Sequence, residues 1–380
     1  MRILFTTVAL SGHFFPLVPL AWAGRLAGHE VLVATSDRFV PVVLRSGLPA
    51  SSCGPDVDFV ELAAAATGHG PDDRRYAHGR AFGQLAEARL AHVRELVESW
   101  QPDVVVSERA EFAGPLAAAA HGIPQVEMHW GVPELPEYRA GAQAELRGVL
   151  ADLGRDTLPR PARVINPWPP SLRLPHTTEH QGIRYVPYNG DAYVPRWVLE
   201  PRERARVCLT VGTLVPRLGA DTVPGLVIPV LEALARLGLD VVVAVDDDVV
   251  NTWPPLPTAV RHAGRLPLAQ VLGACDVVIH HGGQGTALTA LASGVPQLVL
   301  PQFDDQADNA QAVVASGAGL SLAPGNATAQ TVTEYTRELL GTVGFALAAA
   351  EVADEVAAQP TPAEIVDRLP ELVVAAALPS

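Results

Sequence analysis

Short apolar runs alternate with longer amphipathic stretches through the first third of the chain. The apolar runs are rich in Val, Ile and Leu, which is typical of strands buried on both faces of a sheet. The predicted strands are residues 3–8, 30–34, 103–106 and 125–128, and the predicted helices are residues 14–27, 38–45, 80–99 and 111–120. This alternation predicts a parallel sheet covered by helices on both faces.

Nine prolines then interrupt the pattern between Pro159 and Pro201. Proline removes a backbone donor and fixes φ, so this density disfavours both a helix and a central strand. We therefore predict a connection between two domains at about residues 159–201.

After the connection the alternation resumes. The predicted strands are residues 207–211, 240–245, 277–280 and 297–300, and the predicted helices are residues 222–237, 267–273, 284–293, 305–316, 329–341, 343–357 and 362–377. The two halves open alike, with RILFTTVALSG and RVCLTVGTL, each a strand that enters a glycine-containing loop. The sequence predicts two doubly wound, Rossmann-like α/β domains facing across a cleft, with ligands at the carboxyl ends of the strands. The expected domains are 1–195 and 196–360, followed by a C-terminal helix within 361–380 that packs back on the first domain.

Composition restricts the class of partner. The chain has 380 residues, 48% of them hydrophobic, and a net charge of −14, so it can bury a large core and repels nucleic acid and anionic lipid. Its three cysteines are widely spaced, which predicts neither a disulfide framework nor a CxxC metal site. No segment approaches the roughly 18 apolar residues of a membrane helix. We expect a soluble cytoplasmic protein.

The strongest local signal is DVVIHHGGQGTALTALASGVP. Here a predicted strand runs into His281, Gly282, Gly283 and Gly285, and Thr286 opens a helix. Glycines let the backbone approach a ligand closely, and the unpaired N–H groups of the first helical turn attract an anion. His281 adds a donor that can carry charge. The pattern indicates a site for a diphosphate.

Three other interpretations of this turn are weaker. The glycines could serve only a tight turn, but two histidines and a threonine beside them favour a ligand site. A P-loop needs a Lys after the last Gly, and the dinucleotide motif needs GxGxxG, which neither this turn nor Ser11–Gly12 provides. A zinc pair at His280 and His281 is disfavoured, because adjacent residues leaving a strand point apart and no further ligand lies at metal spacing.

HHGGQGT followed by GVPQLVLPQFDDQADNA resembles the donor-binding signature of family 1 glycosyltransferases, which have the GT-B fold. The likeness is to bacterial enzymes that attach deoxysugars to natural products. SGHFFPLVPLA, PDVVVSERAEFAGPLAAAAHGIP and LTVGT resemble other segments of that family, in the same order. The resemblance implies an inverting transfer of a deoxysugar from a nucleoside diphosphate, with dTDP expected over UDP, to a hydroxyl of a hydrophobic acceptor such as an aromatic polyketide. It implies neither a metal nor a cofactor.

The resemblance also assigns residues to the diphosphate. The family histidine that contacts the donor phosphate corresponds to His281, and backbone N–H groups at Gly283, Gly285 and Thr286 would hold the diphosphate. The loop after the first donor-domain strand corresponds to Gly212 and Thr213.

Two further segments match the sugar and the base. Asp305 and Gln306 correspond to the acidic residue and glutamine that meet sugar hydroxyls, although Asp304 competes for this role and Asp305 could instead cap a helix. Backbone groups around Arg265 and Leu266 correspond to the nucleobase site.

His13 is the candidate base, because it follows Gly12 and the first strand at the expected cleft. A neutral imidazole there can take a proton from an acceptor hydroxyl. The alternative is a surface histidine beside a helix. The family supplies an aspartate to orient this histidine, but this chain departs from that pattern and offers Glu108 or Glu111, either of which could instead cap the helix predicted at 111–120.

Aromatic and apolar residues of the first domain could line an acceptor pocket. The cluster comprises Phe14, Phe15, Phe59, Phe82, Met128, His129, Trp130 and Tyr138. We assign Phe82 and Met128 to the core, and consider Phe14, Phe59, His129 and Trp130 the acceptor candidates.

Several alternatives remain open at this point. The acidic triplet Asp246–Asp247–Asp248 could chelate a divalent cation, but a solvated loop is favoured. A C-glycosyltransferase would use a carboxylate base rather than His13. A nucleotide-sugar epimerase or hydrolase would need no apolar acceptor pocket, and a catalytically silent partner would not need His13 and His281. A homodimer is possible.

Overall fold

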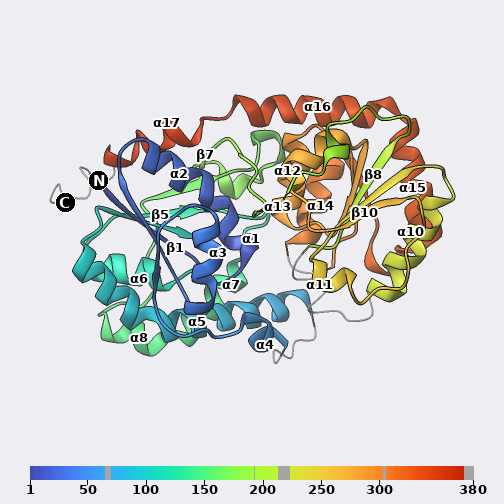
Figure 1. Cartoon of the computed structure of the whole chain (residues 1–380). Coiled ribbons are helices and arrows are strands. Elements are labelled where there is room, and N and C mark those ends of the chain that lie inside the picture. Colours follow the sequence, from blue (N-terminus) through green and yellow to red (C-terminus); the bar gives the residue numbers. More distant parts are fainter. Residues whose placement is uncertain (65–69, 192, 213–222, 303–304, 372–380) are drawn as a thin grey trace.

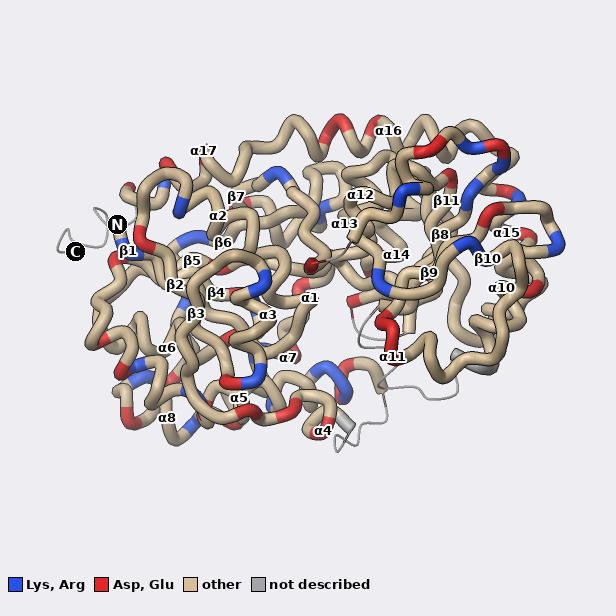
Figure 2. The backbone as a smooth tube through the Cα atoms, viewed as in Figure 1, with Lys and Arg blue, Asp and Glu red and all other residues tan. Residues whose placement is uncertain are grey.

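The computed structural model describes residues 1–64, 70–191, 193–212, 223–302 and 305–371, and it consists of two α/β lobes (Figure 1). Thr213 and Asp304, both named above as candidates, lie outside the described residues. Among the residues described, no helix is both long enough and apolar enough to cross a bilayer. Basic and acidic positions are interspersed over both lobes (Figure 2).

The first lobe is built on a parallel sheet with strand order β3-β2-β1-β4-β5-β6-β7. Its strands are β1 Arg2–Thr6, β2 Glu30–Thr35, β3 Ala50–Ser52, β4 Val104–Glu108, β5 Gln125–Met128, β6 Arg163–Asn166 and β7 Gln181–Gly182. Alternate side chains of β1 enter different apolar clusters, Leu4 on one face and Ile3 and Phe5 on the other. The central strands β1 and β4 are largely apolar because both faces of the sheet are covered there.

Helices cover both faces of this sheet (Figure 1). They are α1 Ser11–Phe14, α2 Val18–Leu26, α3 Val40–Arg45, α4 Phe59–Ala64, α5 Pro71–Trp100, α6 Ala113–Ala120, α7 Pro136–Glu145 and α8 Arg147–Asp152. The helix predicted at 14–27 begins earlier, at Ser11, and a 3-10 turn that contains Pro16 divides it. The helix predicted from residue 80 begins at Pro71, which suits the first helical position.

The second lobe has the strand order β10-β9-β8-β11-β12-β13, again parallel. Its strands are β8 Arg206–Thr210, β9 Asp240–Ala244, β10 Val260–Gly264, β11 Val277–His280, β12 Gln297–Val299 and β13 Gly319–Ser321. Its helices are α10 Ile228–Ala235, α11 Asp247–Val250, α12 Leu268–Val271, α13 Gln284–Ala292, α14 Gln306–Ala315, α15 Ala329–Gly341 and α16 Val343–Ala358. Both sheets therefore have the doubly wound order in which the first strand lies at the topological switch point.

The proline-rich segment is more regular than predicted. β6 pairs with β5 on one side and β7 on the other, so the expectation that this stretch holds no strand inside a sheet is wrong. The physical reason is local, because Arg163–Asn166 lies between Pro161 and Pro167 and contains no proline itself.

The chain crosses back to the first lobe at its C-terminal end. α16 runs along one side of both lobes and leads into α17 Pro362–Val366, which packs on α2 (Figure 1). Ile365 and Val366 are buried in the first lobe's core, and Arg184 N donates to Pro360 O at 2.7 Å. Of the helix predicted at 362–377, the structure describes residues 362–371, in which α17 ends at Val366, and the remainder lies outside the described residues.

Candidate functional site

The carboxyl ends of the two sheets meet between the lobes. Gly131, three residues beyond β5, lies against the second lobe, because a Cβ placed on it would lie 3.2 Å from Cβ of Asp305. Its φ of 73° falls in the region that favours glycine. The loop after β5 therefore contacts the loop after β12, and the candidate residues of the two lobes share one region.

His13 and Glu108 form a pair at this edge. His13 Nδ1 lies 3.0 Å from Glu108 Oε2, and 16% of the His13 side chain is exposed. The Glu108 carboxylate is fully buried and accepts hydrogen bonds from Ala110 N and from Trp130 Nε1, both at 2.8 Å. Burial alone raises the pKa of Glu108, but the His13 ring and these donors outweigh it and hold the pKa below its usual value. An ionised carboxylate thus faces one nitrogen of the imidazole.

Aromatic rings enclose the other sides of His13. Its ring centroid lies 4.9 Å from Trp130 and 5.5 Å from Phe82, and Phe59 stacks on Phe82 at 4.5 Å. Tyr138 closes the cluster, 5.9 Å from Trp130. These rings come from α4, α5, α7 and the loop after β5, so the imidazole of His13 lies beside an apolar wall.

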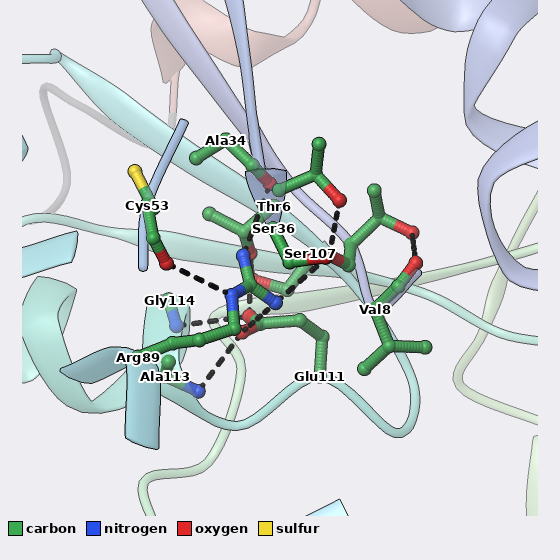
Figure 3. A network of polar contacts seen from close by, with 12 residues as sticks. Thr6, Val8, Ala34, Ser36, Cys53, Arg89, Ser107, Glu111, Ala113 and Gly114 are labelled. Atoms are coloured by element: carbon green, nitrogen blue, oxygen red, sulfur yellow. Dashed lines mark hydrogen bonds and ion pairs between the residues drawn. The ribbon is translucent and has the colours of Figure 1, made fainter. Parts of the chain in front are cut away.

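Glu111 belongs to the polar network that Figure 3 shows. It accepts hydrogen bonds from Thr6 Oγ1 at 2.6 Å and Gly114 N at 2.9 Å, and lies 3.8 Å from Arg89 Nη1. Arg89 in turn donates to Thr7 O at 3.0 Å. Of the two carboxylates considered, Glu108 contacts the histidine, and Glu111 caps the start of α6 and joins the strand ends.

Glu108→Gln and Glu111→Gln are expected to act differently. Glu108→Gln keeps the shape but removes the charge that faces His13, so kcat for the transfer that the resemblance implies should fall by roughly 10²-fold or more. Glu111→Gln leaves Arg89 without its charged partner, so the free energy of unfolding should fall by about 3 kcal/mol with kcat nearly retained. Steady-state kinetics and urea unfolding of both variants test these expectations. A loss of kcat in Glu111→Gln together with normal kcat in Glu108→Gln would contradict the roles given to the two carboxylates.

His281 stands between two glycines at the end of β11. A Cβ on Gly212 would lie 2.4 Å from His281 Cε1, and a Cβ on Gly283 would lie 2.4 Å from His281 Nε2. Gly282 has a φ of 89° and donates its N–H to His280 Nδ1 at 3.1 Å. The glycines therefore make room for the imidazole and for the reversal of the chain.

The sequence suggested that His281 can carry charge, but in the ligand-free chain its ring is neutral at neutral pH. Burial, with a smaller effect of His280, lowers the pKa of His281 to about 3, so the ring is neutral and presents one N–H. Thr286 also differs from the expectation, since its N–H donates to Gly283 O at 3.1 Å. The N–H groups at positions 283 to 285 have no acceptor within α13, so they can still donate hydrogen bonds to an anion.

Gly283→Ala should displace the His281 ring, because the added Cβ needs the space that Nε2 occupies. Affinity for the nucleoside diphosphate that the resemblance implies, probed with thymidine diphosphate, is expected to fall by about tenfold or more, equivalent to ~1.4 kcal/mol. Calorimetric titration measures this. Gly273→Ala is the matched control, since a Cβ there meets nothing within 4 Å, and equal affinities of the two variants would contradict the packing argument.

His280 is a structural residue. Its Nδ1 accepts from Gly282 N, so its Nε2 donates to Gln297 Oε1 at 2.8 Å, and burial lowers its pKa to about 4. An unfolded imidazole has a pKa of about 6.5. Below that pH the unfolded chain therefore binds protons at His280 and His281 that the folded chain does not.

Stability should consequently decrease as the pH falls. The contribution of His280 is present above pH 6.5 and is lost between pH 6.5 and 4. Urea unfolding at pH 7.5, 6 and 5 measures the free energy of unfolding, and His280→Gln should show a weaker dependence on pH. A wild-type free energy that stays constant over this range would contradict the prediction.

Asp305 and Gln306 lie at the start of α14. Asp305 Oδ2 accepts from Asn309 Nδ2 at 2.7 Å, and Gln306 Oε1 accepts from Gln302 N at 2.9 Å. Gln306 is buried, whereas Asp305 is half-buried and faces Gly131. Asp305 is thus the more accessible of the two candidates.

The predicted base-binding segment lies at the end of β10. Arg265 is exposed, its N–H donates to Asp247 Oδ1 at 2.9 Å, and its guanidinium lies 3.4 Å from Asp191; Leu266 is buried. Asp247 opens α11, where Figure 2 marks acidic positions. Across the described ranges, no group of three or more His, Cys, Asp or Glu residues is arranged to hold a metal ion.

The acceptor candidates separate into two groups. Trp130 and Phe59 belong to the aromatic cluster around His13. Phe14 has no exposed surface and packs edge-on against Phe39, so its assignment to a pocket was wrong: it is core. The side chain of His129 points away from that of Trp130, as those of successive residues leaving a strand do. Its ring centroid lies 4.8 Å from that of His180. It also does not line this wall.

Sequence reasoning missed residues that link these parts. Arg109 donates to Trp130 O at 2.9 Å and Pro133 O at 2.7 Å, which fixes the loop after β5. Phe82 was assigned to the core, and although buried it also contacts His13. The helical spacing of residues 80–99 could have predicted that Phe82 faces the core, but it could not have predicted the contact with His13.

Comparison with known proteins identifies the class. Two facing doubly wound domains with a glycine-lined turn on the second define the GT-B fold of glycosyltransferases. Solved structures share it: the glycosyltransferase SsfS6 of Streptomyces sp. SF2575 complexed with thymidine diphosphate (35% identity, TM-score 0.86, covering 98% of this chain and 99% of that one) and the spinosyn rhamnosyltransferase SpnG complexed with spinosyn aglycone (30%, 0.87, 97% and 100%).

The sequence comparisons agree. The family models of erythromycin biosynthesis protein CIII-like N-terminal and C-terminal domains match residues 22–212 and 229–372. The L-demethylnoviosyl transferase of Streptomyces niveus is 40% identical over 375 residues, which is 97% of either chain. The chain belongs to the erythromycin biosynthesis protein CIII-like glycosyltransferases, as the resemblance predicted.

Proposed function

We propose that this glycosyltransferase moves a deoxysugar from a dTDP donor to a hydroxyl of a hydrophobic natural product, with inversion and without a metal ion, in the cytoplasm. The observation that carries the proposal is the His13–Glu108 pair beside an aromatic wall, joined through Trp130 and Gly131 to donor-side Asp305. Relatives complexed with thymidine diphosphate and with an aglycone support the two substrate classes.

The proposed reaction is a single displacement. The acceptor oxygen forms a bond to the anomeric carbon as the bond from that carbon to the diphosphate oxygen breaks. The acceptor proton passes to His13 Nε2, and the carboxylate of Glu108, facing Nδ1, stabilises the imidazolium that forms.

The leaving diphosphate gathers negative charge on the second lobe. Backbone N–H groups at Gly283 and Gly285 and a ring N–H of His281 would stabilise that charge in place. Asp305 would accept hydrogen bonds from sugar hydroxyls, and backbone groups around Arg265 and Leu266 would receive the thymine. Trp130 and Phe59 would hold a flat acceptor beside His13, with the buried Phe82 packed against Phe59.

The test is incubation of the protein with dTDP- and UDP-sugars and a panel of aromatic polyketide aglycones, followed by mass spectrometry. The proposal predicts a product whose mass exceeds that of the aglycone by one sugar residue. This product should still form when a metal chelator is added, and acid should hydrolyse it, as it does an O-glycoside. An acid-stable product would indicate a C–C bond. Donor loss without any new glycoside would identify a hydrolase and contradict the proposal.

A further inference from the structure

The side chain of Gln284 links the two lobes at the head of α13. It is 6% exposed, and its Oε1 accepts hydrogen bonds from Gly131 N at 2.5 Å and from Trp168 Nε1 at 2.9 Å. Both groups can only donate, so the amide atom that faces them must be the oxygen. A single oxygen of the second lobe thus holds two buried donors of the first part of the chain.

Asn309 makes the adjacent link from α14. Its Oδ1 accepts from Val132 N at 2.9 Å, and its Nδ2 donates to Gly282 O at 3.0 Å. Two consecutive backbone N–H groups, at Gly131 and Val132, are therefore received by two side-chain amides of the second lobe. We refer to Gln284 and Asn309 as the amide pair.

The amide pair connects the two halves of the proposed chemistry. On one side it touches the glycine turn, since Gln284 follows Gly283 in sequence and Asn309 bonds Gly282. On the other side it holds the loop that begins with Trp130, whose indole donates to Glu108. Displacement of this loop would shift the Glu108 carboxylate and, with it, the His13 ring.

We propose that Gln284 is a positioning residue, which holds the base His13 at the correct distance from the donor-binding turn. This inference rests on the proposed function. Its chemical reason is that an in-line displacement tolerates little error in the distance between acceptor oxygen and anomeric carbon, and a misplacement of about 1 Å can cost roughly 10²-fold in rate.

Gln284→Met tests whether the side-chain oxygen is required, because methionine has a similar length but no oxygen to accept hydrogen bonds from Gly131 N and Trp168 Nε1. We expect kcat for transfer to fall by about 10²-fold, with a larger share of donor lost to hydrolysis. The Kd for thymidine diphosphate should stay close to that of the wild type. A residue needed only for folding would not change the ratio of transfer to hydrolysis.

Gln284→Glu is the complementary variant. It keeps an oxygen for both donors but places negative charge at the start of α13, where the diphosphate is proposed to bind. We expect the ratio of transfer to hydrolysis to stay near that of the wild type, because both donors keep their acceptor, and the Kd for thymidine diphosphate to rise by about tenfold or more, equivalent to ~1.4 kcal/mol. Gln284→Met should therefore change the ratio of transfer to hydrolysis and leave the Kd, whereas Gln284→Glu should change the Kd and leave that ratio.

Gln330→Met is the matched control, since Gln330 is exposed and its amide donates only to Glu334 within α15. Hydrogen exchange at the amides of Gly131 and Val132 gives a readout that needs no substrate, and it should accelerate in Gln284→Met alone. Unchanged hydrogen-exchange rates at these amides in Gln284→Met would overturn the inference. So would a wild-type kcat and a wild-type ratio of transfer to hydrolysis in that variant. If the wild type itself transfers no sugar, the proposed function fails, while the exchange measurement still tests the contact.

Discussion

His13→Ala is expected to lower kcat for sugar transfer by about 10²- to 10⁴-fold, the contribution typical of a positioned general base. The Glu108 carboxylate faces Nδ1 of this ring at 3.0 Å, which leaves Nε2 to take the proton of the acceptor hydroxyl. Thymidine diphosphate should bind the variant as tightly as the wild type, because the proposed diphosphate contacts all lie on the second lobe.

The matched control for this variant is His121→Ala. His121 follows α6, away from the aromatic cluster, and its Nε2 lies 3.7 Å from Glu98 Oε1. Its substitution should therefore leave kcat unchanged. Steady-state kinetics with a saturating donor separate kcat from donor binding. A His13→Ala variant that retains normal kcat would leave the reaction without this base and refute the proposed mechanism.

His281→Ala should produce the second large effect, a fall of kcat/KM for the donor by roughly 10²- to 10³-fold, as expected when one preorganised donor to a developing anion is removed. Burial lowers the pKa of this ring in the ligand-free chain, and in either protonation state the substitution removes an N–H donor beside the diphosphate. Gly212 and Gly283 pack on both sides of the ring, and its removal leaves space that water can enter.

Two measurements isolate this effect. Calorimetry should show weaker binding of thymidine diphosphate by His281→Ala, and urea unfolding should show a folded protein. His281→Asn, which retains an N–H donor, should recover part of the affinity. Wild-type donor kinetics in His281→Ala would remove the residue from the donor site.

The doubly wound fold could be predicted from sequence because parallel strands covered on both faces are apolar throughout, as Ile3, Leu4 and Phe5 illustrate. The glycine turn was predictable for a similar reason, since strand, glycines and helix start are contiguous in the chain. The resemblance then supplied the position of His13, which pattern alone would have left as a surface histidine.

Other features depend on contacts that the linear sequence does not contain. β6 was missed because proline density was averaged over a segment in which Arg163–Asn166 is free of proline. Glu108 and Glu111 could not be distinguished, since the choice depends on Arg89, which lies on α5 and bonds the ends of β1 and β2. The contact of Gln284 with Gly131 joins residues 153 positions apart.

The central claim is that the turn at residues 281–285 holds the donor diphosphate opposite the His13–Glu108 pair. A crystal structure of the protein with thymidine diphosphate tests it most directly. The account predicts diphosphate oxygens within hydrogen-bonding distance of the His281 ring and of the N–H groups of Gly283 and Gly285. A diphosphate bound elsewhere on the second lobe, or on the first, would contradict it.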